Sequence, residues 1–206
     1  MLGRVFAHYK RKRDLNHLKD KRFAFLFEED CSGEVVVFDT ETTGLDPKKD
    51  AIVSIGAVKI KANKILTSQA FELFVKNDTI EKKSIEIHGI RPIDVQNGKE
   101  SQEAIEEFLY FIGSRPLVGY YLEFDMAMIN KYLKPMLGVA LPNKAIEVSA
   151  LYYDKKIGRI PQGNVDLRFD TILKDCAIPN MGVHNALNDA IMSAMIYLKL
   201  TKGECK

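Results

Sequence analysis

Apolar residues form continuous runs in the first part of the chain beyond residue 33. Residues 34–39 have the pattern of a buried strand. Residues 51–60 and 66–75 repeat the pattern, and the short polar segment 61–64 joins them. Because short connections join consecutive strands in antiparallel pairs, the pattern predicts an antiparallel meander of three strands.

Apolar residues then recur with the period of a helix. A short strand is predicted at residues 117–118, and the Gly-, Pro- and Lys-rich segment 138–166 is expected to be loops around a short element near 146–152. Strands followed by helices and further strands predict a mixed sheet flanked by helices. The predicted helices cover residues 104–112, 125–133 and about 185–200.

Composition predicts one α/β domain with an appendage, since 46% of the 206 residues are hydrophobic. Basic side chains are concentrated in residues 1–22, which hold eight against two acids, whereas the rest of the chain is mildly acidic. We therefore expect a helical basic arm over residues 1–33 and a single folded domain over residues 34–206. No run resembles a membrane span or a secretory leader, so a cytoplasmic location without membrane contact is expected.

The basic arm, residues 1–22, is open to two interpretations. It binds a phosphate backbone or a partner protein, or it is a solvated helix or frayed terminus that binds nothing.

Two carboxylates, Asp39 and Glu41, stand at the end of the first predicted strand. Side chains two residues apart point to the same face of a strand, so the two anions lie side by side. A hard divalent cation would relieve their repulsion. The alternative is a solvated turn.

Three more residues are candidates for the same site. Asp125 opens the predicted helix 125–133, where it either joins the acids or interacts with the helix dipole. Asp189 lies on a helix that is apolar on most sides, and a buried carboxylate needs a metal or a base. His184 precedes that helix and is either a capping residue or a general base.

The residues around these acids resemble the three motifs of the DEDDh exonuclease family, which includes the proofreading epsilon subunit of bacterial DNA polymerase III, oligoribonuclease and ribonuclease T. The segment Ile87-His88-Gly89-Ile90 is also similar to the family. The resemblance covers roughly residues 34–200. Its motifs are Phe38-Asp39-Thr40-Glu41-Thr42-Thr43-Gly44-Leu45, Phe124-Asp125 and His184-Asn185-Ala186-Leu187-Asn188-Asp189-Ala190.

The resemblance implies a ribonuclease H-like fold: a mixed five-stranded sheet, its first three strands antiparallel, with helices on both faces. It also implies 3′-to-5′ exonuclease activity with two Mg²⁺ or Mn²⁺ ions, and His184 as the general base that deprotonates the attacking water. Two such ions activate the water and balance the charge that grows on the phosphate during hydrolysis. The implied metal ligands, which are also catalytic, are Asp39, Glu41, Asp125 and Asp189.

Substrate contacts are expected on both sides of the acids. By resemblance, Thr42, Thr43 and Gly44 contact the terminal nucleotide. Family members often carry a His-Asn pair before the second motif, where this chain has Tyr120 and Tyr121. Either the two tyrosines stack on a base, or one belongs to the core and the other to the rim.

The leading hypothesis is an exonuclease that shortens single-stranded DNA from its free 3′ end and releases nucleoside 5′-monophosphates in proofreading or repair. One alternative is an enzyme that trims RNA 3′ ends. Another is a nuclease-fold binding module whose arm, residues 1–22, docks a polymerase or another protein. Internal cutting is disfavoured by the spacing of His184 and Asp189.

Overall fold

The computed structural model describes residues 2–77, 80, 82–157 and 164–202, and the side chains from residue 9 onward. No helix in these ranges is long and apolar enough to cross a membrane. The strands are β1 (Glu34–Thr42), β2 (Ile52–Lys61), β3 (Lys64–Ile65), β4 (Phe71–Phe74), β5 (Leu117–Gly119) and β6 (Ala145–Glu147). The helices are α1 (Leu2–His17), η1 (Lys21–Phe27), η2 (Thr67–Gln69), α2 (Lys82–His88), α3 (Pro92–Val95), α4 (Ser101–Ile112), α5 (Leu122–Leu137), α6 (Val148–Ile157), α7 (Phe169–Asp175) and α8 (Ala186–Lys202).

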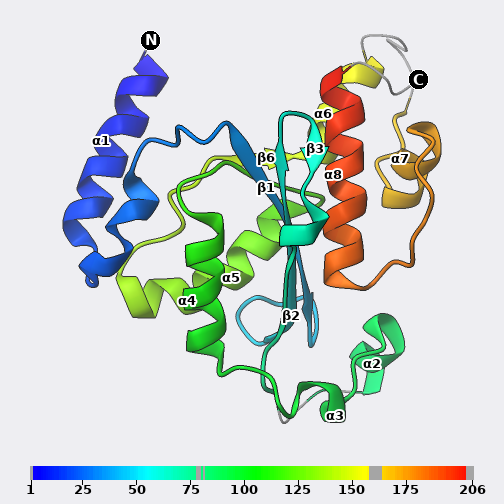
Figure 1. The fold of residues 1–206 in the computed structure, drawn as a ribbon, viewed down its shortest axis with the longest axis horizontal. Coiled ribbons are helices and arrows are strands. Elements are labelled where there is room, and N and C mark those ends of the chain that lie inside the picture. The colour runs from blue at the N-terminus through cyan, green and yellow to red at the C-terminus, as the bar shows by residue number, and fades with distance from the viewer. Residues whose placement is uncertain (1, 78–79, 81, 158–163, 203–206) are drawn as a thin grey trace.

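The strands form one mixed sheet in the order β3-β2-β1-β5-β6, with β4 also paired to β2 (Figure 1). Strand β1 pairs with β2 antiparallel and with β5 parallel. The predicted third strand, residues 66–75, is interrupted. Its residues Thr67–Gln69 form the turn η2, in which the backbone N–H groups of Gln69 and Ala70 donate to carbonyls three residues earlier. The sheet confirms the predicted fold, but β4 covers only residues 71–74 of the predicted third strand, and β3 lies just before that strand.

Helices cover both faces of the sheet and enclose two apolar clusters (Figure 1). Side chains of β1 alternate between them: Val36 and Phe38 belong to the cluster with α4 and α5, and Val37 to the cluster with α6, α7 and α8. The alternation follows from the two-residue period of a strand. Residues 39 and 41 therefore face α8, whereas residue 40 faces α5.

The segment before β1 packs against the domain. Phe23 and Leu26 of η1 are fully buried in the same cluster as α4 and α5. The Arg11 guanidinium of α1 donates to the carbonyls of Leu26, Phe27 and Glu28. Helix α1 is thus fastened to the end of η1. A division of the chain after residue 33 stays a prediction.

Two predicted boundaries are corrected. Helix α5 begins at Leu122, so Asp125 lies inside its first turn. In the segment predicted as loops, β6 and α6 are regular elements, and residues 158–163 lie outside the described part. Helix α6 has two basic residues in its last turn and few buried positions, so its apolar period is weak.

Candidate active site

Strand β1 supplies the first two carboxylates. Glu41 is 7% exposed and Asp39 is half-buried. Asp39 lies opposite Gly56 of β2, and the strand register shifts between Glu41 and Thr42, where the regular ladder ends. Both acids therefore lie at the end of β1, on the face covered by α8.

A glycine lets α8 approach that face. A Cβ atom on Gly56 would lie 2.2 Å from the backbone nitrogen of Leu187 and 2.3 Å from the carbonyl carbon of Ala186. Only a residue without a side chain fits under this first turn of α8. Because Gly56 pairs with Asp39, the close approach brings Asp189 of α8 beside the acids of β1. Sequence reasoning missed Gly56, although a glycine inside a strand pattern often marks a close backbone approach.

Asp189 completes a cluster of three acids. Carboxylate oxygens of Asp39, Glu41 and Asp189 all lie within 4.8 Å of one another. The backbone N–H of His184 donates to Asp189 Oδ2 at 2.9 Å, while Asp189 Oδ1 is buried and has no hydrogen-bond partner. His184 has a left-handed backbone, φ 64°. Its ring lines the cavity that contains the acids.

Asp125 reaches the same cavity from the other side of the sheet. It is 3% exposed, and its Oδ1 accepts hydrogen bonds from the Thr40 backbone nitrogen at 2.9 Å and from Thr40 Oγ1 at 2.6 Å. Thr40 stands between Asp39 and Glu41 and points toward α5. Asp125 lies outside the cluster of three but lines their cavity, which has a volume of about 490 Å³.

The four acids fit a divalent cation. Burial raises the pKa of all four, and repulsion between the carboxylates adds to the shift for Asp39 and Glu41; the pKa of Glu41 rises to about 8 and that of Asp125 to about 7. Buried anions without counter-charge are unstable, and carboxylate oxygens are the ligands that hard cations prefer. The unpaired Oδ1 of Asp189 is an oxygen such an ion would use.

Three of the predicted substrate residues shape the loop after β1. Thr42 Oγ1 donates to the carbonyl of Gly44, and Thr43 Oγ1 donates to Asp50 Oδ1. A Cβ atom on Gly44 would lie 2.6 Å from the Asp50 carboxylate. None of the three lines the cavity; the next residue, Leu45, does, and it is 84% exposed.

The two tyrosines have different environments. Tyr120 is half-buried; its hydroxyl donates to the carbonyl of Leu167 and its ring lies 4.8 Å from that of Phe169. Tyr121 is 68% exposed. Both line the cavity. Tyr120 therefore packs within the protein, whereas Tyr121 presents an exposed ring at the rim, with the Phe124 ring on one side. Sequence reasoning missed Arg168, Phe169 and Ser193, which also line the cavity. Arg168 and Phe169 lie in a segment without a strong pattern, whereas Ser193 lies on the predicted last helix, where a lone serine gives no signal of a site.

Comparisons with known proteins agree with this geometry. The profile of a family described as exonuclease (RNase_T) matches residues 36–197. A PolC-type DNA polymerase III from Thermotoga maritima is 30% identical over 167 residues, 81% of this chain but 12% of that protein. The DNA polymerase III subunit epsilon of Aquifex aeolicus is 28% identical over 168 residues, 82% of this chain and 80% of the relative. The chain thus spans about one eighth of the PolC-type relatives.

Solved structures share the fold. The nuclease CRN-4 superposes with a TM-score of 0.71 at 16% identity, covering 84% of this chain and 65% of that one. Escherichia coli exonuclease I, solved with a dT13 oligonucleotide, gives a TM-score of 0.67 at 14% identity, covering 82% of this chain and 41% of that one. The chain therefore belongs to the exonuclease family of the DEDDh type, whose members are metal-dependent 3′-to-5′ phosphodiesterases, and this confirms the resemblance of its three motifs.

Proposed function

We propose that this protein removes nucleotides one at a time from the 3′ end of single-stranded DNA and releases nucleoside 5′-monophosphates. The observation that carries the proposal is the convergence of four buried or half-buried carboxylates from β1, α5 and α8 in one cavity, with His184 at its edge. Such acids repel one another, so their convergence has a physical reason only if they hold cations.

Each residue has a defined part in the proposed reaction. Asp39, Glu41, Asp125 and Asp189 would hold two Mg²⁺ or Mn²⁺ ions. When bound, such ions lower the pKa of a water and neutralise charge on the phosphate and leaving oxygen. His184 accepts the proton of the attacking water, because its ring lines the cavity while its backbone is fixed to Asp189.

DNA is the preferred substrate in this proposal because the relatives named above are DNA polymerase III proteins, and one structural neighbour was solved with a DNA oligonucleotide. The proposal extends to proofreading or repair. A polymerase or another protein would then dock on the basic arm, where Lys10, Lys12 and Arg13 are exposed.

The test is digestion of 3′-labelled and 5′-labelled single-stranded oligomers of DNA and RNA, with Mg²⁺ or EDTA. Stepwise shortening from the 3′ end that needs Mg²⁺ and is lost in Asp39→Ala is the expected result. The matched control is Asp154→Ala, since Asp154 is exposed on α6 and lines neither this cavity nor the groove described below. Metal-independent cleavage, or none, would contradict the proposal. Faster digestion of RNA would redirect it to RNA 3′-end trimming.

A further inference from the structure

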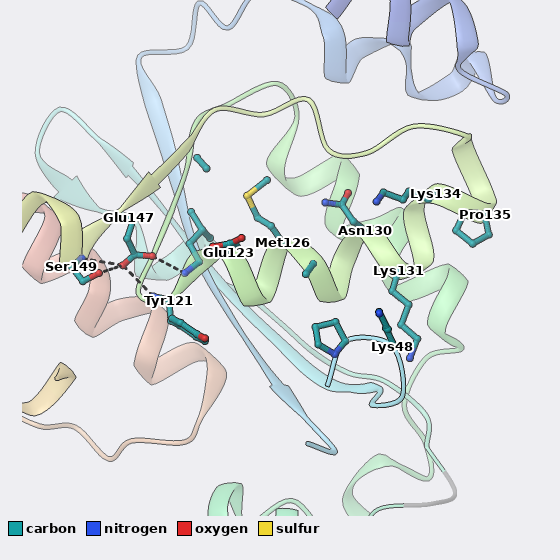
Figure 2. A pocket seen from close by; sticks show the side chains of 14 residues that line it. Lys48, Tyr121, Glu123, Met126, Asn130, Lys131, Lys134, Pro135, Glu147 and Ser149 are labelled. Atoms are coloured by element: carbon teal, nitrogen blue, oxygen red, sulfur yellow. Dashed lines mark hydrogen bonds between the residues drawn. The ribbon is translucent and has the colours of Figure 1, made fainter. Parts of the chain in front are cut away.

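A second hollow runs along the outward side of α5, next to the catalytic cavity (Figure 2). Its volume is about 1080 Å³, at the upper end of the roughly 300–1,000 Å³ typical of small-molecule sites. Tyr121 lines both hollows, so they meet at its ring. We call this second hollow the lysine groove. At Tyr121 it adjoins the cavity in which the 3′ end would react.

The groove changes in character along its length. Met126, Ala127 and Pro135 give it an apolar floor. Figure 2 shows Glu123 and Glu147 at the end near Tyr121, and Lys48, Lys131 and Lys134 at the opposite end.

Two of these lysines are available to a ligand. Lys48 and Lys134 are exposed, and no ion pair joins either of them to a carboxylate in the described part of the chain. Lys131 is less available to a ligand, because its Nζ donates a hydrogen bond to the carbonyl of Asp50. This bond links the loop after β1 to α5. The far end of the groove therefore presents two exposed positive charges that no ion pair neutralises in the described residues, although Lys48 also interacts electrostatically with Asp46.

The carboxylate of Glu147, at the near end, already has hydrogen-bond partners within the protein. It accepts hydrogen bonds from the backbone N–H groups of Tyr121 and Leu122 at 3.1 and 2.8 Å, and from Ser149 Oγ at 2.8 Å (Figure 2). These donors stabilise the anion and hold the first residues of α5. Glu147 thus acts as the anchor of Tyr121.

Tyr121 is held in an unusual backbone conformation. Its φ of 55° and ψ of 33° are left-handed, which is uncommon for a residue with a large side chain. Strain of this kind persists where the surroundings impose it, and it clusters at functional sites. Here it places an exposed aromatic ring between the two hollows, with the Phe124 ring stacked beside it at 6.3 Å.

We propose that the lysine groove binds the nucleotides that precede the scissile 3′ end of a single strand, with a base on Tyr121 and the phosphates on Lys48 and Lys134. This inference rests on the proposed function and names how its substrate is held. Aromatic faces stack bases of any sequence, and a basic groove follows the backbone. Lys134 lies thirteen positions after Tyr121, about 20 Å along the helix at 1.5 Å per residue, which about six stacked nucleotides would span.

The test uses the double variant Lys48→Gln/Lys134→Gln with fluorescein-labelled oligothymidylates of about 4 and about 12 nucleotides. Binding is followed by fluorescence anisotropy in EDTA, and digestion by steady-state kinetics in Mg²⁺. We expect the Kd and KM of the longer oligomer to rise about tenfold, with kcat unchanged and with little effect on the shorter one. The slope of log Kd against log salt should become shallower by about 1.4, because each phosphate contact on a single strand contributes about 0.7.

The matched control is Lys64→Gln/Lys174→Gln, which removes two exposed lysines outside both hollows and should behave as the wild type. Wild-type binding and digestion of the longer oligomer by the groove variant would overturn the inference and leave a polypeptide as the occupant. An equal loss on both oligomers would also overturn it, since the lysines would then act at the catalytic cavity. If the wild-type protein shows no nuclease activity but the variant still binds the longer oligomer more weakly than the wild type, the result would support the groove and contradict the proposed function.

Discussion

The catalytic cavity and the lysine groove meet at Tyr121 but are built in different ways. The cavity gathers buried acids from three elements on both faces of the sheet, and it depends on strand register and on the close approach of α8. The groove uses the outward side of α5, a neighbouring loop and residues of β6 and α6. The acids proposed to perform chemistry thus depend on the packing of the whole domain, whereas the proposed strand-binding residues are exposed and depend on the anchoring of Tyr121 by Glu147.

The largest effect expected is from Asp189→Asn, which removes a charge from the cluster and leaves the groove intact. We expect kcat to fall by about 10²–10³-fold or more, the loss typical when one electrostatic group of an active site is removed. Affinity for the longer oligomer in EDTA should stay the same or rise, because a buried negative charge is removed. Single-turnover digestion and anisotropy measure the two effects. A parallel loss of binding would show that the two hollows are not separable.

His184→Gln should give the next largest effect. A general base contributes about 10²–10⁴-fold, so a fall of about 10²-fold in kcat is expected. The backbone hydrogen bond from residue 184 to Asp189 does not need the imidazole ring, so the rise in melting temperature on adding Mg²⁺ should be retained. Thermal denaturation with and without Mg²⁺ checks this. Loss of the Mg²⁺ effect would make His184 a metal ligand or a structural support instead.

Gly56→Ala tests whether packing positions the acids. The added methyl group would collide with the backbone of α8, so the helix must shift and carry Asp189 away from Asp39. We expect about tenfold lower kcat and about 1–3 kcal/mol lower stability to denaturant. The control is Ile60→Val on the same strand, which removes about 0.5–1.5 kcal/mol of packing without touching α8's first turn. An equal loss of activity in both variants would show that stability alone is responsible.

A smaller effect is expected from pH in the metal-free protein. Burial raises the pKa of Glu41 to about 8 and of Asp125 to about 7, above the values of the unfolded chain, so the folded state binds more protons between about pH 4 and 8. Stability present at low pH is lost as the pH rises through 7 and 8. In EDTA the melting temperature should therefore fall by about 5 °C or more from pH 5.5 to 8.5.

Added Mg²⁺ should remove most of that fall by neutralising the acids. The groove variant Lys48→Gln/Lys134→Gln should show the same pH profile as the wild type, because neither lysine lines the catalytic cavity. A flat profile in EDTA would mean that the acids are already neutralised by another group.

The candidate acids could be singled out from the sequence because the patterns that mark them are local, and their catalytic role stays a prediction. Asp39 and Glu41 follow an apolar strand, and Asp189 lies on an apolar helix. The groove and the role of Glu147 were not predictable. Glu147 accepts a hydrogen bond from the backbone of Tyr121, 26 positions earlier in the sequence, and no local pattern marks that contact. Thr42 and Thr43 show the converse. Their place in the motif predicts substrate contact, which stays a prediction, whereas the hydrogen bonds by which their hydroxyls hold the loop were not foreseen.

Helix α5 carries Asp125 in its first turn and Lys134 near its end. In the proposed complex, the length of α5 therefore sets the distance between the bond that is hydrolysed and the most distant phosphate contact, at Lys134. A DNA strand shortened below that length would lose its contact with the lysines of the groove, while its 3′ end would still fit the cavity. Digestion would then slow abruptly and leave residual oligonucleotides of nearly uniform size, so the end products would report the length of the helix.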